Sequence, residues 1–137
     1  MPFVIDASVA LSWCFEDETS AYADAVLERL RRESGAVQTL WHMEIVNVLV
    51  LANRAGRLTD EKLARGIQLI RSLPIEMKDI NESEVQTSVM DLARKYRLTI
   101  YDASYLYIAL REGLPLASLD GDLLDAAPKA GVEILQP

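Results

Sequence analysis

The chain begins Met1-Pro2-Phe3-Val4-Ile5-Asp6-Ala7-Ser8, and three of these residues form an apolar run that leads directly into a carboxylate. A short apolar run of this kind predicts a buried strand, Phe3–Ile5, that ends at Asp6. The same pattern recurs near the C-terminus, where residues 116–119 lead into Asp120. The carboxyl ends of parallel strands meet at one edge of a sheet, so we expect the two aspartates to lie in the same crevice.

Helical patterns alternate with short predicted strands along the rest of the chain. We expect helices over residues 19–34, 41–55, 60–73, 82–97, 103–112 and 122–129. Further strands are expected over residues 37–40, 75–78, 116–119 and 132–135. This alternation predicts an α/β fold with one domain over residues 1–137. We expect a three-layer sandwich with a central parallel sheet and helices on both faces.

Individual residues mark the expected ends of several helices. Thr59 is a predicted N-cap, and Asn81 with Glu84 resembles the start of a capping box. Gly35 and Gly56 are predicted to end the helices over residues 19–34 and 41–55.

The overall charge limits the kinds of partner. The chain has 21 acidic and 14 basic residues and a formal net charge of −7. This balance argues against a broad basic surface for nucleic acid, and it predicts attraction to a basic partner. Ions held by carboxylates would offset the negative charge at a metal site itself.

Cysteine use and hydropathy indicate the compartment. Cys14 is the only cysteine, and we interpret it as a buried structural thiol in a cytoplasmic protein. A signal peptide has a basic segment before its apolar run, and no such segment precedes Phe3–Ile5. Every apolar run is far shorter than the roughly 20 residues that span a bilayer. We therefore expect a soluble protein with no membrane partner.

Four acidic residues stand out by position: Asp6, Glu44, Asp102 and Asp120. Most of these residues have a structural explanation when considered alone. Asp102 is placed to cap a helix, as is Asp122, two residues after Asp120, and Asp120 itself lies in a turn-like Asp-Gly pair. Asp6 is different, because it follows an apolar strand and no lysine or arginine lies within the first 28 residues. A buried carboxylate needs a compensating charge, and hard cations such as Mg²⁺ or Mn²⁺ prefer oxygen ligands. The group therefore predicts a metal-dependent site that cleaves phosphodiesters.

Other kinds of site have less support in the sequence. His42 is the only histidine, which argues against a histidine-rich zinc site and against a Ser-His-Asp triad. We interpret it as a packing residue beside Trp41 or as a hydrogen-bonding residue at the start of a helix. The sequence contains no glycine-rich phosphate loop, so nucleotide binding of that type is not expected.

At the acidic residues the chain resembles the PIN domain family, and most closely its VapC-type toxins. The resemblance covers nearly the whole chain and lies in four ordered stretches: Val4-Ile5-Asp6-Ala7-Ser8, Glu44-Ile45-Val46-Asn47, Tyr101-Asp102-Ala103-Ser104-Tyr105 and Ser118-Leu119-Asp120. By this resemblance Asp6, Glu44, Asp102 and Asp120 correspond to the acidic active-site quartet, and Asp122 is a further candidate metal ligand. Ser118 stands where the family often has threonine, and it keeps the hydroxyl group.

The same resemblance implies a ribonuclease that uses Mg²⁺ or Mn²⁺, forms a homodimer and is inhibited by a VapB-like antitoxin. In that reading, metal held by Asp6 and Asp102 activates a water molecule, and a second ion near Asp120 stabilises the departing oxygen. Glu44 is placed to bind through water or to accept a proton. The candidates for orienting the carboxylates are Ser8, Ser118 and Asn47.

Two other classes of function are alternatives. One is a metal-dependent phosphohydrolase for small molecules, such as a haloacid-dehalogenase-like phosphatase, but that family needs a second aspartate where this chain has Ser8. The other is a catalytically silent PIN-like module that binds RNA or a protein, but all four acids are present. For an RNA substrate, the candidate backbone contacts are Arg29, Arg31 and Arg32; Arg54 and Arg57; Lys62 and Arg65; and Arg94, Lys95 and Arg97. Most of these residues also fit a solvated helix face.

Overall fold

Four parallel strands form one sheet in the order β3-β2-β1-β4, in a computed structural model that describes all residues from 1 to 137. The strands are β1 (Phe3–Ile5), β2 (Gly35–Gln38), β3 (Ile75–Lys78) and β4 (Leu116–Ala117). Every pairing within the sheet is parallel. The predicted parallel sheet is therefore confirmed.

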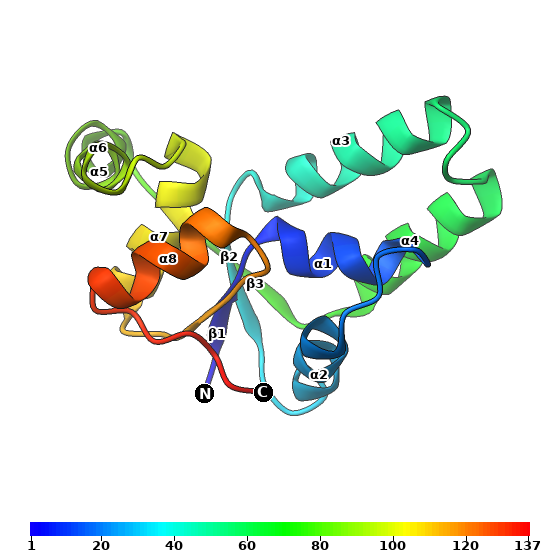
Figure 1. The fold of residues 1–137 in the computed structure, drawn as a ribbon, viewed down its shortest axis with the longest axis horizontal. Helices are drawn as coiled ribbons and strands as arrows, with labels where there is room; N and C mark the ends of the chain where they lie inside the picture. The colour runs from blue at the N-terminus through cyan, green and yellow to red at the C-terminus, as the bar shows by residue number, and fades with distance from the viewer.

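Helices connect these strands. Their bounds are α1 (Ala7–Cys14), α2 (Ala21–Arg29), α3 (Trp41–Arg54), α4 (Asp60–Ser72), α5 (Glu82–Glu84), α6 (Met90–Tyr96), α7 (Ile100–Glu112) and α8 (Gly121–Lys129). Helices α1 to α4 lie on one side of the sheet and α5 to α8 on the other, as the three-layer prediction requires (Figure 1). None of the helices is both long enough and apolar enough to cross a membrane.

The core is centred on β1. Phe3, Val4 and Ile5 are at most 1% exposed, and β1 pairs with β2 on one side and with β4 on the other. A strand that is covered on both faces has no solvent face, which explains the continuous apolar run at the N-terminus. Helix α7 packs across β1 and β2 with a long series of buried residues.

Three of the expected helix ends are confirmed. Thr59 Oγ1 accepts a hydrogen bond from the Lys62 N–H at the start of α4. Asn81 and Glu84 exchange the two hydrogen bonds of a capping box at the start of α5. Gly56 follows the end of α3 with φ +79°, a left-handed conformation that favours glycine.

Gly35 does not end a helix, contrary to the prediction. Helix α2 ends at Arg29, and Gly35 is the first residue of β2. A Cβ atom on Gly35 would lie 2.6 Å from Ile5 Cδ1 and 2.9 Å from Ile75 Cδ1. Glycine at this position therefore leaves room for the isoleucine side chains of the two neighbouring strands.

The helix expected over residues 82–97 is made of three consecutive segments. A π-helical stretch, Val85–Val89, lies between α5 and α6, and its ring of hydrogen bonds is one residue wider than that of an α-helix. Helix α6 ends at Tyr96, and its C-cap residue, Arg97, has a left-handed φ of 55°, which is uncommon for a residue other than glycine. The chain then turns directly into α7.

Several strand boundaries and one helix differ from the expected pattern. The strand expected over residues 132–135 is reduced to a single parallel bridge between Ile134 and Leu116. The strand expected over 37–40 begins two residues earlier, and the one expected over 116–119 is only two residues long. Helix α1 is not apparent from the sequence pattern, because most of its residues are apolar and show no polar face.

The start of α7 provides a stability test. The sequence predicts Asp102 as the N-cap, but Thr99 has that role, since its Oγ1 accepts from the Asp102 N–H at 3.1 Å. We expect Thr99→Ala to lower the free energy of unfolding by about 1 kcal/mol, the usual effect of losing an N-cap. Asp102→Asn should leave the metal-free protein equally stable or more stable, because it removes a charge that nearby carboxylates repel. Urea unfolding in EDTA measures both variants, and a larger loss for Asp102→Asn would contradict this assignment.

Candidate active site

The four acids of the predicted quartet lie at the N-terminal ends of helices. Asp6 caps α1 directly after β1, and Asp120 caps α8 shortly after β4. Glu44 lies in the first turn of α3, which follows β2, and Asp102 lies in the first turn of α7. The partial positive charge at a helix N-terminus favours carboxylates in these positions.

Asp6 is held in place by hydrogen bonds to both carboxylate oxygens, and it is only 3% exposed. Ser8 donates to Oδ1 through its hydroxyl and through its N–H at 3.1 Å, and Ser118 Oγ donates to Oδ2 at 2.7 Å. The two serine hydroxyls accept in turn from the N–H groups of Leu119 and Asp120. These bonds join the end of β1 to the segment after β4, and they give Ser8 and Ser118 the orienting role expected of them.

Burial raises the pKa of Asp6 from 3.8 to about 6. The hydrogen bonds from Ser8 and Ser118 act in the opposite direction, and repulsion by Asp120 adds to the rise. A pKa this high in spite of several donors indicates that no positive charge lies close to the carboxylate. The charged form of Asp6 would therefore be stabilised by a cation.

Two buried residues without an expected role hold Glu44. Gln38 Nε2 donates to Oε1 at 2.7 Å, and the Tyr105 hydroxyl donates to Oε2 at 3.2 Å. Burial raises the pKa of Glu44, these two hydrogen bonds oppose the rise, and repulsion by Asp102 adds to it. Tyr105 carries a sequence signal, because a buried tyrosine hydroxyl needs a partner. Gln38 carries none, because nothing in the pattern predicts a buried glutamine at the end of β2.

Repulsion by neighbouring acids contributes to the raised pKa values of Asp6, Glu44 and Asp102. Burial raises the pKa of Asp102, and repulsion by Asp120 and Asp122 adds to the rise. Asp102 in turn raises the pKa of Glu44, and Asp120 raises that of Asp6. Asp122 is exposed in the first turn of α8 and caps no helix, because Asp120 holds the N-cap position. The structure thus brings the quartet and Asp122 into one electrostatic group.

No basic side chain of the protein neutralises this group. The ion pairs of the structure use other carboxylates, and none includes Asp6, Glu44, Asp102, Asp120 or Asp122. No three of these acids converge closely enough to form a ready-made ion cage. Mg²⁺ needs no such cage, because it usually keeps several waters and uses one or two carboxylates. The oxygen-only donor set therefore fits a hard divalent cation.

Two residues on α3, Asn47 and His42, differ in whether they have the role expected from the sequence. Asn47 is exposed, and its side chain makes no hydrogen bond to the acids, so the orienting role expected of it is absent. His42 packs the edge of its ring against Trp41, with 4.9 Å between ring centroids and 88° between planes. The packing role predicted for His42 is confirmed.

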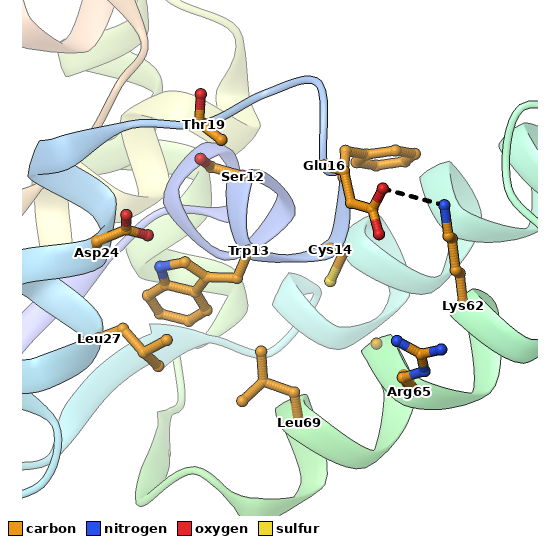
Figure 2. A pocket seen from close by; sticks show the side chains of 12 residues that line it. Ser12, Trp13, Cys14, Glu16, Thr19, Asp24, Leu27, Lys62, Arg65 and Leu69 are labelled. Atoms are coloured by element: carbon orange, nitrogen blue, oxygen red, sulfur yellow. Dashed lines mark hydrogen bonds and ion pairs between the residues drawn. The ribbon is translucent and has the colours of Figure 1, made fainter.

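A hollow of about 330 Å³ lies away from the acids, where the end of α1 faces α2 and α4 (Figure 2). The residues that line it include Trp13, Cys14, Leu27, Lys62 and Leu69. Cys14 is half-buried rather than buried, and its thiol donates weakly to the Ala10 carbonyl at 3.6 Å. Burial raises the pKa of this thiol, which keeps it protonated and unreactive as a nucleophile.

The sequence of this chain matches the profile of a known family and is similar to a known protein. The profile of the family described as "PIN domain" matches residues 3–129. The protein named Ribonuclease VapC3 from Pyrobaculum aerophilum is 28% identical to this chain over 130 residues. The aligned part covers 93% of this chain and 96% of that protein.

Solved structures share the fold. VapC20 from Mycobacterium tuberculosis, described as a sarcin-ricin loop cleaving toxin, has a TM-score of 0.66 and 15% identity over 98% of this chain and 99% of that one. VapBC2 from Rickettsia felis, described as bound to a DNA fragment from its promoter, has a TM-score of 0.69 and 11% identity over 98% of each chain. At these identities the likeness concerns the fold.

Proposed function

Because this chain belongs to the PIN domain family, we propose that it is a ribonuclease that depends on Mg²⁺ or Mn²⁺ and acts as the toxin of a toxin–antitoxin pair. The observation that carries the proposal is a group of mutually repelling carboxylates at four helix N-termini that no lysine or arginine neutralises. The name of the relative VapC3, a ribonuclease, supports RNA as the substrate.

The roles of the residues follow from how each is held. Asp6, Asp102 and Asp120 are the proposed metal ligands, with Glu44 and Asp122 as further ligands, directly or through water. The ion supplies Lewis-acid activation of water and neutralises charge at the phosphate. Ser8 and Ser118 keep the Asp6 carboxylate in one orientation. Gln38 and Tyr105 do the same for Glu44, whose raised pKa makes its carboxylate a stronger base than an ordinary one.

The direct test is incubation of the purified protein with RNA in Mg²⁺, in Mn²⁺ and in EDTA. Cleavage with either ion and none with EDTA is the expected result. Hydrolysis of small phosphate esters without cleavage of RNA would instead favour a phosphohydrolase. RNA binding without any cleavage in either ion would favour a catalytically silent module.

A basic antitoxin segment is the proposed partner protein. The net charge of −7 and the acidic site would attract an arginine or lysine side chain, which would compete with metal for the carboxylates. A solved structure of the same fold, described as a toxin–antitoxin complex from Klebsiella pneumoniae, supports this proposal. Co-expression with a small protein encoded upstream should yield a co-purifying complex. A cytoplasmic location stays a prediction.

We further expect a homodimer, and α3 is the surface that favours it. Met43, Val46 and Leu51 of α3 are 70%, 39% and 49% exposed, whereas the large apolar residues of α2 are buried or half-buried. Light scattering at micromolar concentration should give about twice the 15.3 kDa of one chain. Leu51→Glu should shift the protein to a monomer. The matched control Met77→Glu, at a 54% exposed position on β3, should leave the mass unchanged.

A further inference from the structure

Most basic side chains of this acidic protein are already neutralised. Eight of the 14 lysines and arginines form ion pairs with carboxylates: Arg29, Arg31, Arg57, Lys62, Arg65, Lys78, Arg111 and Lys129. The other six are exposed and have no carboxylate partner: Arg32, Arg54, Arg71, Arg94, Lys95 and Arg97. A phosphate can bind one of these six without first breaking an ion pair.

The six unpaired cations are not evenly distributed. Arg32, Arg54 and Arg71 lie singly, near the ends of α2, α3 and α4. The other three lie within four residues of one another at the end of α6: Arg94 and Lys95 in its last turn, and Arg97 at the left-handed residue that ends the helix. This is the only place in the chain where unpaired positive charge is concentrated.

The cluster at the end of α6 is close in sequence to one residue of the acidic site, Asp102. Arg97 precedes Asp102 by five residues, so their Cα atoms are at most about 17 Å apart. Only Leu98 and Thr99 separate Arg97 from the start of α7, whose first turn carries Asp102. A strand bound at Arg97 would therefore pass within about 17 Å of Asp102.

An exposed aromatic residue, Tyr101, lies between the cations and Asp102 in the sequence. Tyr101 is in the first turn of α7, directly before Asp102, and it is 54% exposed. Its hydroxyl makes no hydrogen bond within the protein, in contrast to the buried Tyr105. Cations for the backbone beside an exposed aromatic face for a base are the combination with which proteins bind single-stranded nucleic acid.

We infer that Arg94, Lys95, Arg97 and Tyr101 form a strand-entry surface that holds single-stranded RNA beside the acidic site. The three cations bind successive phosphates, and the ring of Tyr101 stacks on a base. This inference rests on the proposed ribonuclease function and names the surface that holds its substrate. It also explains how a chain with a net charge of −7 binds RNA, because local unpaired charge takes the place of a broad basic face.

The test is binding of a fluorescent single-stranded RNA oligonucleotide to the full chain in EDTA, measured by anisotropy over a range of salt concentrations. The test variant is the triple substitution Arg94→Gln, Lys95→Gln and Arg97→Gln. The matched control is Arg32→Gln, Arg54→Gln and Arg71→Gln, which removes the same charge from the three isolated cations. Basic residues in a last turn also favour the helix dipole, so the melting temperature of each variant is compared first.

The strand-entry triple variant should bind RNA at least roughly tenfold more weakly. The slope of log K against log salt concentration should become shallower by about 2, because the variant removes three phosphate contacts and each contributes about 0.7 on single strands. The control triple variant should keep both the wild-type slope and most of the affinity. Tyr101→Leu should weaken binding by about tenfold with an unchanged salt slope, since stacking involves no counterion release.

Several outcomes overturn the inference. If the two triple variants weaken RNA binding equally, only net charge matters and the strand-entry surface is refuted. In that case, cleavage of RNA by the wild type in Mg²⁺ would still support the ribonuclease assignment. If the wild type neither binds nor cleaves RNA, both proposals fail. If polyglutamate binds as tightly as RNA, is weakened by the same triple variant and is unaffected by Tyr101→Leu, the surface holds an acidic polypeptide instead.

Discussion

Asp6→Asn is expected to reduce RNA cleavage by about 1,000-fold while the fold stays intact. Asparagine has nearly the same shape and still accepts the hydrogen bond that Ser8 donates at the start of α1. It lacks the charge that would hold a divalent cation, and such a cation stabilises the transition state by several kcal/mol. Each 1.36 kcal/mol of this stabilisation that is lost slows the reaction about tenfold. Initial rates of RNA cleavage at saturating Mg²⁺ or Mn²⁺ measure the loss.

The control for this variant is Asp125→Asn, which makes the same charge change on an exposed residue of α8 that pairs with Lys129. It should cleave RNA at close to the wild-type rate. Ser118→Ala tests the orientation of Asp6 separately, and a loss of about 10- to 100-fold is expected when a residue that orients a ligand is removed. Full activity in Asp6→Asn, or wild-type cleavage that persists in EDTA, would falsify the acidic-site mechanism.

The second large effect is on stability. We expect the metal-free protein to be less stable at pH 7.5 than at pH 5 by about 1.5 kcal/mol, as a consequence of the pKa of Asp6 alone. The folded-state pKa of about 6 lies above the ordinary value of 3.8, so the native state binds this proton more tightly than the unfolded chain. This stabilisation is therefore complete below pH 3.8 and is lost as the pH rises through 6. The raised pKa values of Glu44 and Asp102 act in the same direction.

The range from pH 5 to 7.5 avoids the loss of stability that occurs at lower pH when carboxylates with lowered pKa values are protonated. Hydrogen bonds from Tyr107 and Arg111 lower the pKa of Glu84 to about 2, so its contribution is lost only as the pH falls below its ordinary value of 4.5. Urea unfolding in EDTA between pH 5 and 7.5 measures the slope. Asp6→Asn should flatten it, Asp125→Asn should not, and added Mg²⁺ should flatten it in the wild type. A wild-type slope of opposite sign would show that Asp6 is not the dominant group in this range.

The sequence predicts the parts of the fold and site that depend on local chemistry. A continuous apolar run that ends in a carboxylate is enough to predict β1 and the position of Asp6, because few other arrangements bury such a run. Thr59 and Asn81 are correct caps for the same reason, since their side chains bond within three residues.

The rest depends on contacts between distant residues. Gly35 is a common helix terminator, but the two isoleucines that need its small size come from strands far away in the sequence. Asp102 is a frequent type of N-cap, yet Thr99 three residues earlier takes that place. Gln38 reaches Glu44 only because β2 ends beside the first turn of α3, and no periodicity reports that geometry.

The hydrogen bond between Asp6 and Ser118 also bears on how the protein is synthesised. It spans 112 positions of the chain, and β1 pairs with β4 only after residue 117 has been made. Chains emerge from the ribosome N-terminus first, so Asp6 waits for most of translation before its partner exists. A nascent chain, or one truncated before β4, therefore carries Asp6, Glu44 and Asp102 but lacks Ser118, Asp120 and Asp122, so the site is not assembled. The proposed activity therefore requires synthesis of nearly the whole chain, because Ser118 and Asp120 lie close to its C-terminus.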